Sequence, residues 1–291
     1  MSEEAKSLFE YKQELQSAIW FENAPLDATL DLAVQAVIEA GKPEQAGDYY
    51  RPCVHEDLLL VYQMMDLPGY AIELETIASR FIAEIPSSRQ CHFCMATLHV
   101  QGLLGQRRYA DADRAAALHL AELGLSPEHR NRRLDLVMLR ADIAAAAGDL
   151  VALRLHVEEL CRELPKISRG DNVLRAGIWC SALRLVCVEG DANAAARLFE
   201  QIVAEVQATA DFALAARVVY AGYLARTKRS AEAFAVIEGG LVPARTRQAH
   251  RWHAELLAIG HALDGRYASE LATVLKRLKS RDLDGALKVL R

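Results

Sequence analysis

Residues 141–164 read ADIAAAAGDLVALRLHVEELCREL, and this stretch decides the fold. At its centre, Gly148 suits the left-handed conformation that ends a helix, and Asp149 can accept the free amides of a following helix. The residues after this turn follow the i, i+3, i+4, i+7 spacing of one buried helical stripe. That stripe comprises Leu150, Leu153, Val157, Leu160, Cys161 and Leu164. The stretch therefore predicts two helices joined by a tight turn.

Turns of this kind recur along the chain. Gly105, Gly190 and Gly265 each close one apolar stripe and open another, and Thr227–Ser230 does the same without glycine. Gly105, Gly148 and Gly190 are 43 and 42 residues apart, and the 75 residues from Gly190 to Gly265 suit two repeats of about 37. Longer joints are expected between these hairpins, at residues 126–128, 165–171 and 208–211 and at Pro243.

A fixed period of helix, tight turn, helix and joint is typical of an α-solenoid. One helix pair cannot bury its own apolar face, so the stacked neighbours supply the core. No run of alternating apolar and polar residues is long enough for a convincing strand. The sequence therefore predicts an all-α chain of stacked antiparallel helix pairs.

Some of these turns resemble those of tetratricopeptide repeats. Gly105-Gln-Arg-Arg-Tyr-Ala-Asp-Ala112 is similar to the glycine, aromatic and alanine turn of that family, as is Gly190 to Ala195 with Phe199; Gly265-Arg-Tyr267 is a partial match. The resemblance covers residues 88–280. The chain lacks the tryptophan and Leu-Gly of the family's first helix, and its period exceeds 34 residues. The resemblance implies a right-handed, tetratricopeptide-like solenoid.

Three segments are expected from this pattern. Residues 1–87 form an N-terminal helical region or cap, in which residues 41–54 are the longest irregular stretch. Residues 88–280 form the helical repeats, and residues 281–291 form a C-terminal capping or partial-repeat helix. The long irregular stretch suits either a functional loop or a simple connection.

Composition bounds the class of protein. The 291 residues are 52% hydrophobic and 25% charged, the balance of a folded globular chain. The longest stretch free of acidic and basic residues, Gln90–Gln106, is too polar for a membrane span. No basic start followed by an apolar stretch opens the sequence, and Cys94, Cys161, Cys180 and Cys187 lie in apolar helical patterns. We therefore expect a cytoplasmic protein with reduced core thiols.

The charge is unevenly distributed. Residues 1–57 carry 12 acidic and 4 basic side chains, whereas residues 240–291 carry 10 basic and 5 acidic ones, within a net charge of −5. Opposite poles permit head-to-tail contact between copies, and an apolar edge at the C-terminal helix permits a homo-oligomer there. The negative net charge argues against nucleic acid as the main partner.

A column of arginines suggests a binding surface. Arg133, Arg175 and Arg217 lie 42 residues apart in the first helices of three successive repeats, and Arg140 shares a face with Arg133. Stacked first helices line the inner groove of tetratricopeptide-like solenoids, and arginine forks bind carboxylates with two bonds. Tyr220 and Tyr223, on the helix of Arg217, would add contact area. The alternative is that these arginines cover apolar edges with their stems.

The remaining candidate site is a metal site. Cys91 and Cys94 share a helix face, and with Cys53 and His55 they would offer four ligands to tetrahedral zinc. The spacing between the halves matches no established pattern, and apolar neighbours favour core packing instead. The sequence contains no phosphate loop, nucleophile elbow, His-Glu-x-x-His helix or dinucleotide fingerprint. We therefore expect neither a cofactor nor enzymatic activity.

These observations favour a non-enzymatic scaffold or adaptor, whose groove binds a protein or an acidic peptide. One alternative is a ligand- or peptide-sensing solenoid that acts with a bacterial transcription regulator, its basic end (Lys276, Arg277, Lys279 and Arg281) near nucleic acid. A second alternative is a metal-dependent helical enzyme that uses the cysteine and histidine set.

Overall fold

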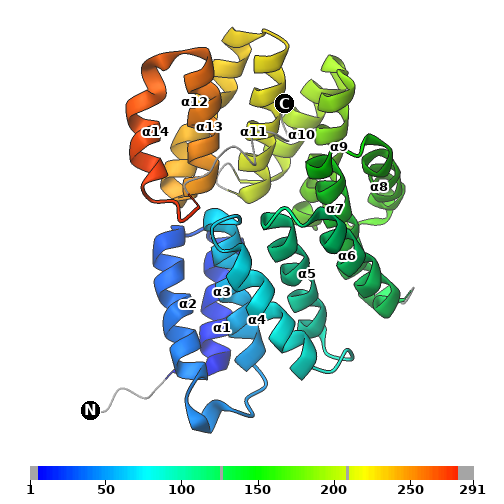
Figure 1. The fold of residues 1–291 in the computed structure, drawn as a ribbon, viewed down its shortest axis with the longest axis vertical. Coiled ribbons are helices and arrows are strands. Elements are labelled where there is room, and N and C mark those ends of the chain that lie inside the picture. Colours follow the sequence, from blue (N-terminus) through cyan, green and yellow to red (C-terminus); the bar gives the residue numbers. More distant parts are fainter. Residues whose placement is uncertain (1–5, 125–126, 208–209, 281–291) are drawn as a thin grey trace.

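The computed structural model describes residues 6–124, 127–207 and 210–280, and within them the chain forms fourteen α-helices and no strand (Figure 1). The predicted all-α fold is confirmed. The expected helix over 281–291 lies outside the described residues. The helices are α1 Leu8–Gln16, α2 Leu26–Ala40, α3 Arg51–Asp66, α4 Ala71–Glu84, α5 Gln90–Gly105, α6 Tyr109–Leu123, α7 Arg130–Ala147, α8 Leu150–Glu163, α9 Asn172–Glu189, α10 Ala192–Glu205, α11 Asp211–Arg226, α12 Ser230–Arg247, α13 His250–Leu263 and α14 Ala268–Leu275.

The glycine–aspartate turns form as the sequence predicts. Gly148 and Gly190 adopt φ of 74° and 82°, a left-handed conformation that ends α7 and α9. The side chains of Asp149 and Asp191 then each accept a backbone amide three residues later, at 2.9 Å. These short connections hold α7 against α8 and α9 against α10.

Two connections differ from the prediction. Pro243 was expected at a joint but lies inside α12, and the break falls at Gln248 and Ala249 instead. A proline ring meets the carbonyl four residues earlier, which here belongs to Gly239, so the backbone has freedom to adjust there. The irregular stretch 41–54 is also shorter than expected, because α3 begins at Arg51 with Pro52 in its first turn.

The helices form a continuous series of contacts. Each helix packs on the next along the chain, and α3, α5, α7, α9, α11 and α13 also each contact the following member of this set. We call these six helices the central row. Because α5 packs on both α3 and α4, the contacts continue across residues 87 and 88. The other helices lie outside this row.

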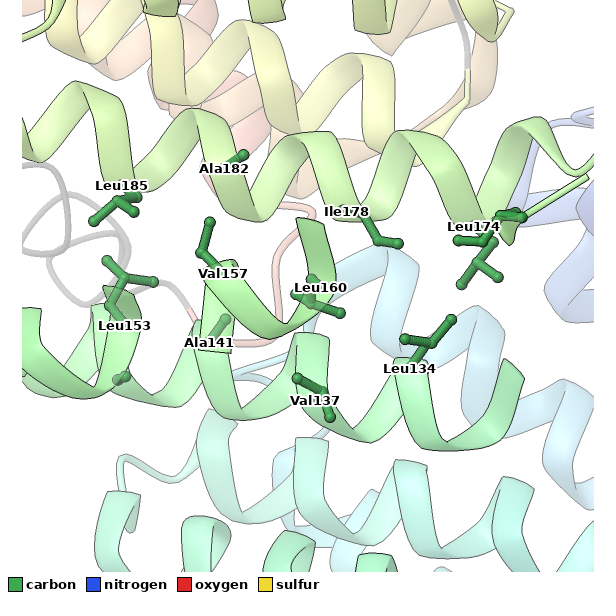
Figure 2. Packing of buried hydrophobic residues seen from close by; sticks show 12 residues of the cluster. Leu134, Val137, Ala141, Leu153, Val157, Leu160, Leu174, Ile178, Ala182 and Leu185 are labelled. Carbon is green, nitrogen blue, oxygen red and sulfur yellow. The ribbon is translucent and has the colours of Figure 1, made fainter. Parts of the chain in front are cut away.

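Leucine, isoleucine, valine and alanine side chains fill the space between successive helix pairs. Figure 2 shows one such cluster, in which Leu153, Val157 and Leu160 of α8 face residues of α7 and α9. Each fully buried side chain of this size contributes about 1.5–3 kcal/mol. The buried apolar face of α8 is narrower than the sequence predicts, because Leu150 is 38% exposed and Cys161 also faces solvent. Cys94, Cys180 and Cys187 are buried as expected, and all six cysteines are free.

The last helix pairs contact the first ones. In Figure 1 helices α12–α14 lie directly above α1–α3, and α13 contacts α3. An apolar cluster joins Ile19, Leu26 and Val61 to Leu214 and Ala249, among others. The predicted stack carries no such contact, because the helical period says nothing about where the two ends of the array meet.

Arg247, at the end of α12, forms hydrogen bonds that connect the last helices to the first ones. Its side chain is 1% exposed and donates to the carbonyls of Ala18, Ile19 and Ala24, in and after the π-helical turn Ser17–Phe21. Nearby, the His250 ring lies 3.3 Å from the Asp27 carboxylate. A guanidinium is suited to this position because its donors point in several directions within one plane.

The Arg247→Met variant should lose about 2–4 kcal/mol of unfolding free energy, since three buried carbonyls lose their donor. Urea unfolding followed by circular dichroism measures the loss. Arg245→Met, two residues away and 49% exposed, is the matched control and should change stability by less than about 1 kcal/mol. Equal losses in the two variants would contradict the assigned role of Arg247.

No helix of residues 6–124, 127–207 and 210–280 has the length and apolar character needed to cross a lipid bilayer.

Candidate functional site

The predicted arginine column makes contacts within the protein. Arg133 donates to the carbonyl of Gly124 at 2.9 Å, at the end of α6. Arg140 forms two bonds with the Asp113 carboxylate on α6, at 2.7 and 3.2 Å. Both side chains therefore point toward the neighbouring outer helix.

The other two arginines of the column are also engaged. Arg175 lies over the ring of Trp179 at 4.8 Å, and 3.9 Å from the Glu205 carboxylate. Arg217 donates to the Ala213 carbonyl and packs against Gly240 of α12, and burial lowers its pKa. Each of the four arginines thus contacts a group of the protein itself, and their role in binding a partner stays a prediction.

Tyr220 and Tyr223 belong to the core. They are 5% and 3% exposed, and Tyr220 stacks on Phe199 of α10 with ring centroids 4.6 Å apart. The Tyr223 hydroxyl donates to the Gly190 carbonyl at 3.3 Å. The prediction that these two tyrosines add contact area to a groove is therefore corrected. Their rings fill the space between α9, α10 and α11. Helical spacing places them on one face but does not say which face is covered.

The cysteines and the histidine that the sequence suggests as metal ligands have different partners in the structure. The Cys53 and Cys91 thiols interact, and this interaction lowers the pKa of Cys91 to about 7 and raises that of Cys53. Burial raises the pKa of Cys94, whose thiol faces Glu56. His55 turns away, with Nδ1 2.8 Å from the Arg51 carbonyl. Within the described part of the chain these four residues do not form a cluster of potential metal ligands.

A different set of polar side chains lies along the central row. On α7, Arg132 lies 3.5 Å from the Asp135 carboxylate. Farther along the same helix, Asp142 accepts from Arg184 of α9 at 2.5 Å. We call Arg132, Asp135, Asp142 and Arg184 the polar stripe. It lies apart from the apolar contacts that α7 makes with its neighbours.

The aspartates of the polar stripe are partly exposed and yet surrounded by protein. The Asp135 and Asp142 side chains are 30% and 31% exposed. Even so, burial raises the pKa of Asp135 to about 6, against the opposing effect of Arg132. Burial also raises the pKa of Asp142, despite Arg184. Charged side chains held in this environment are suited to recognition, because their interactions are screened less than those at an open surface.

Further charges connect the polar stripe to the junction of the two ends. Arg251 of α13 lies 3.9 Å from Asp66 of α3 and pairs with Glu255 on its own helix. Burial raises the pKa of Glu255, and Arg184 of the polar stripe is close enough to lower it. Asp66 also accepts from the backbone amide and hydroxyl of Ser280, at 2.8 and 3.0 Å.

A signal for the polar stripe exists in the sequence. Residues 132, 135 and 142 fall on one face of an ideal helix, between two apolar faces. The pairing of Asp142 with Arg184 has a separation of 42 residues, equal to the repeat interval. The predicted basic end near residue 280 is partly engaged within the protein. Lys279 pairs with Glu73 and lies over the Tyr70 ring, and Arg281 lies outside the described residues.

Searches against protein-family models, curated proteins and solved structures each find no match for this chain.

Asp135→Asn should gain stability relative to the wild type as the pH rises. In the wild type, the folded form holds the Asp135 proton more tightly than the unfolded chain, because the folded pKa of about 6 exceeds the ordinary value of 3.8. Folding stability is therefore lost as the pH rises through about 6. The free energy of unfolding of the variant, relative to the wild type, should increase by about 1–3 kcal/mol between about pH 4 and pH 7.

Urea unfolding at several pH values measures this difference. The exposed Asp31→Asn on α2 is the matched control. A difference between Asp135→Asn and the wild type that stays constant with pH would show that the Asp135 carboxyl is not protonated preferentially in the folded protein.

Proposed function

We propose that this chain is a non-enzymatic scaffold that binds a peptide or protein segment along its central row. The observation that carries the proposal is the unbroken series of contacts from α3 to α13, which presents side chains from successive helices side by side. Helical arrays of this kind offer extended surfaces that engage an elongated partner without chemistry. The proposal includes a right-handed, tetratricopeptide-like arrangement of the helix pairs.

Local features support that arrangement. Gly105 and Gly190 stand at the ends of α5 and α9, and Gly265 opens the turn before α14, at the positions that the resemblance requires. Ala112 and Ala195, which follow two of these turns, are fully buried, as small residues between closely packed helices should be. Phe199 packs against the core of the next repeat through Tyr220.

The polar stripe indicates the chemistry of the partner. The aspartates of the polar stripe pair with Arg132 and Arg184, and they keep 30% and 31% of their side chains exposed. The stripe carries both signs of charge, so it suits a peptide that offers a carboxylate to Arg132 or Arg184 and a cation to Asp135 or Asp142.

Peptides selected from a random displayed library on the wild-type protein provide the test. The double variant Asp142→Asn with Arg184→Met should bind the selected peptides at least about tenfold more weakly, as measured by fluorescence anisotropy, since arginine contacts at the centre of an interface contribute 1–2 kcal/mol or more. Circular dichroism checks that the variant keeps its helicity.

The matched control is Arg229→Met with Glu232→Gln, an ion pair of the same 2.5 Å separation at the start of the outer helix α12. This variant should bind like the wild type. Arg133→Ala, Arg175→Ala and Arg217→Ala together test the arginine column. Loss of binding in this triple variant alone would show that the peptide binds at the arginine column and not at the polar stripe. Failure to select any peptide on the wild type would contradict the proposal.

A further inference from the structure

A second cluster of chemically capable side chains lies between α5 and α6, away from the polar stripe. His92 is in the first turn of α5, and His119 and Glu122 are one turn apart near the end of α6. The two helices are neighbours in the chain and contact each other. Their short connection makes them antiparallel, so the beginning of α5 lies beside the end of α6.

The three side chains converge on one point. One potential ligand atom from each lies within 4.8 Å of the others. Glu122 Oε2 is 3.1 Å from His119 Nδ1 and 3.9 Å from His92 Nε2. Two ligands of a tetrahedral zinc ion are roughly 3.3 Å apart, given metal–ligand distances near 2.1 Å. A small movement of Glu122, whose side chain is 41% exposed, would complete such a set.

The hydrogen bonding of His92 leaves a lone pair directed at this point. Its Nδ1 lies 2.9 Å from the carbonyl of Ile85, which only accepts, so Nδ1 carries the hydrogen. In the neutral ring Nε2 is then an acceptor, and it faces the carboxylate of Glu122. Two electron-rich atoms in this position call for a cation between them. The bond to Ile85 is the kind of support that metal-bound histidines receive.

Two buried nitrogens in the cluster have no hydrogen-bond partner. These are Nε2 of His92 and Nε2 of His119, in side chains that are only 8% and 6% exposed. Buried polar atoms are normally satisfied, so each one requires an explanation. A bound ion would be coordinated by His92 Nε2, whereas His119 would coordinate through Nδ1, the nitrogen that lies against Glu122, and its Nε2 would stay unpaired. Within the described part of the chain, no lysine or arginine pairs with Glu122, and the ion-pair partners of its carboxylate there are the two histidines.

We propose that His92, His119 and Glu122 form a binding site for Zn²⁺. Two imidazoles and one carboxylate suit zinc, whereas Mg²⁺ and Ca²⁺ prefer sites built from oxygen. Three protein ligands leave a fourth position for water or for a group of a partner. The site is independent of the proposed peptide binding, because no residue of the polar stripe contributes to it.

Titration of chelator-treated, full-length protein with ZnCl₂ alone, followed by isothermal calorimetry, provides the test. We expect one Zn²⁺ per chain and a rise in the thermal unfolding midpoint on binding. Glu122→Gln and His119→Asn should each weaken binding at least about tenfold, since even indirect supports of a metal site have effects of this size. Glu122→Gln replaces a partly exposed side chain, so the fold is retained.

Two control variants carry the same substitutions elsewhere: Glu158→Gln on α8 and His261→Asn on α13, both at exposed positions. They should bind zinc like the wild type. Substitution with Co²⁺ gives a spectrum that identifies the ligands, and the expected result is a d–d band without thiolate charge-transfer absorption.

The proposal is overturned if the wild type binds no zinc. It is also overturned if Glu122→Gln and His119→Asn bind with wild-type affinity, or if Cys53→Ser with Cys91→Ser removes binding and thiolate absorption is present in the Co²⁺ form. The last outcome would assign the metal to the thiol pair.

Discussion

A stack of helix pairs has two apolar ends, and in this protein each end covers the other. The pairs between them are covered by their neighbours, as the α7–α8 pair is by α6 on one side and α9 on the other. At the ends, Ile19, Leu26 and Val61 meet Leu214 and Ala249. The buried guanidinium of Arg247 satisfies three carbonyls at this junction. Without this contact, both terminal pairs would expose surfaces that the helical spacing makes apolar.

The same arrangement explains where charge is tolerated inside the molecule. Asp142 and Arg184 come from consecutive members of the central row and pair directly, as do Arg251 and Glu255 within α13. Burial alone would favour neutral acids, and it does raise the pKa of Asp135 and Asp142. The arginines limit this effect. In both of these pairs, the charged side chain has its partner on the same helix or on the next helix of the central row.

Much of the local structure could be predicted from the sequence, since it depends on neighbours in the chain. Gly148 and Asp149 end one helix and start the next through their own backbone and side chain, so the turn is visible in two residues. The contact of Arg247 with Ala18 joins residues 229 positions apart, and no periodicity reports it. Proline by itself predicts a break at residue 243, whereas in α12 the carbonyl four residues earlier belongs to Gly239 and the helix continues.

In the candidate sites, too, local spacing could be predicted from the sequence, whereas contacts between distant residues could not. Tyr220 and Tyr223 have the spacing of a shared face, but only the packing of α10 reveals that this face is buried. His92 and His119 are 27 residues apart and belong to no motif, so their approach depends on the antiparallel pairing of α5 with α6. Cys91 and Cys94 do share a motif-like spacing, yet their thiols face different partners, Cys53 and Glu56.

The contact between the first and last helices also has a consequence for how such a chain can evolve. An open array tolerates the duplication or loss of one hairpin, because each unit interacts with its neighbours alone. Here an inserted hairpin would separate α3 from α13 and remove the Arg247 bonds. We therefore expect the number of hairpins to be invariant in descendants of this gene, with variation in length confined to the connections.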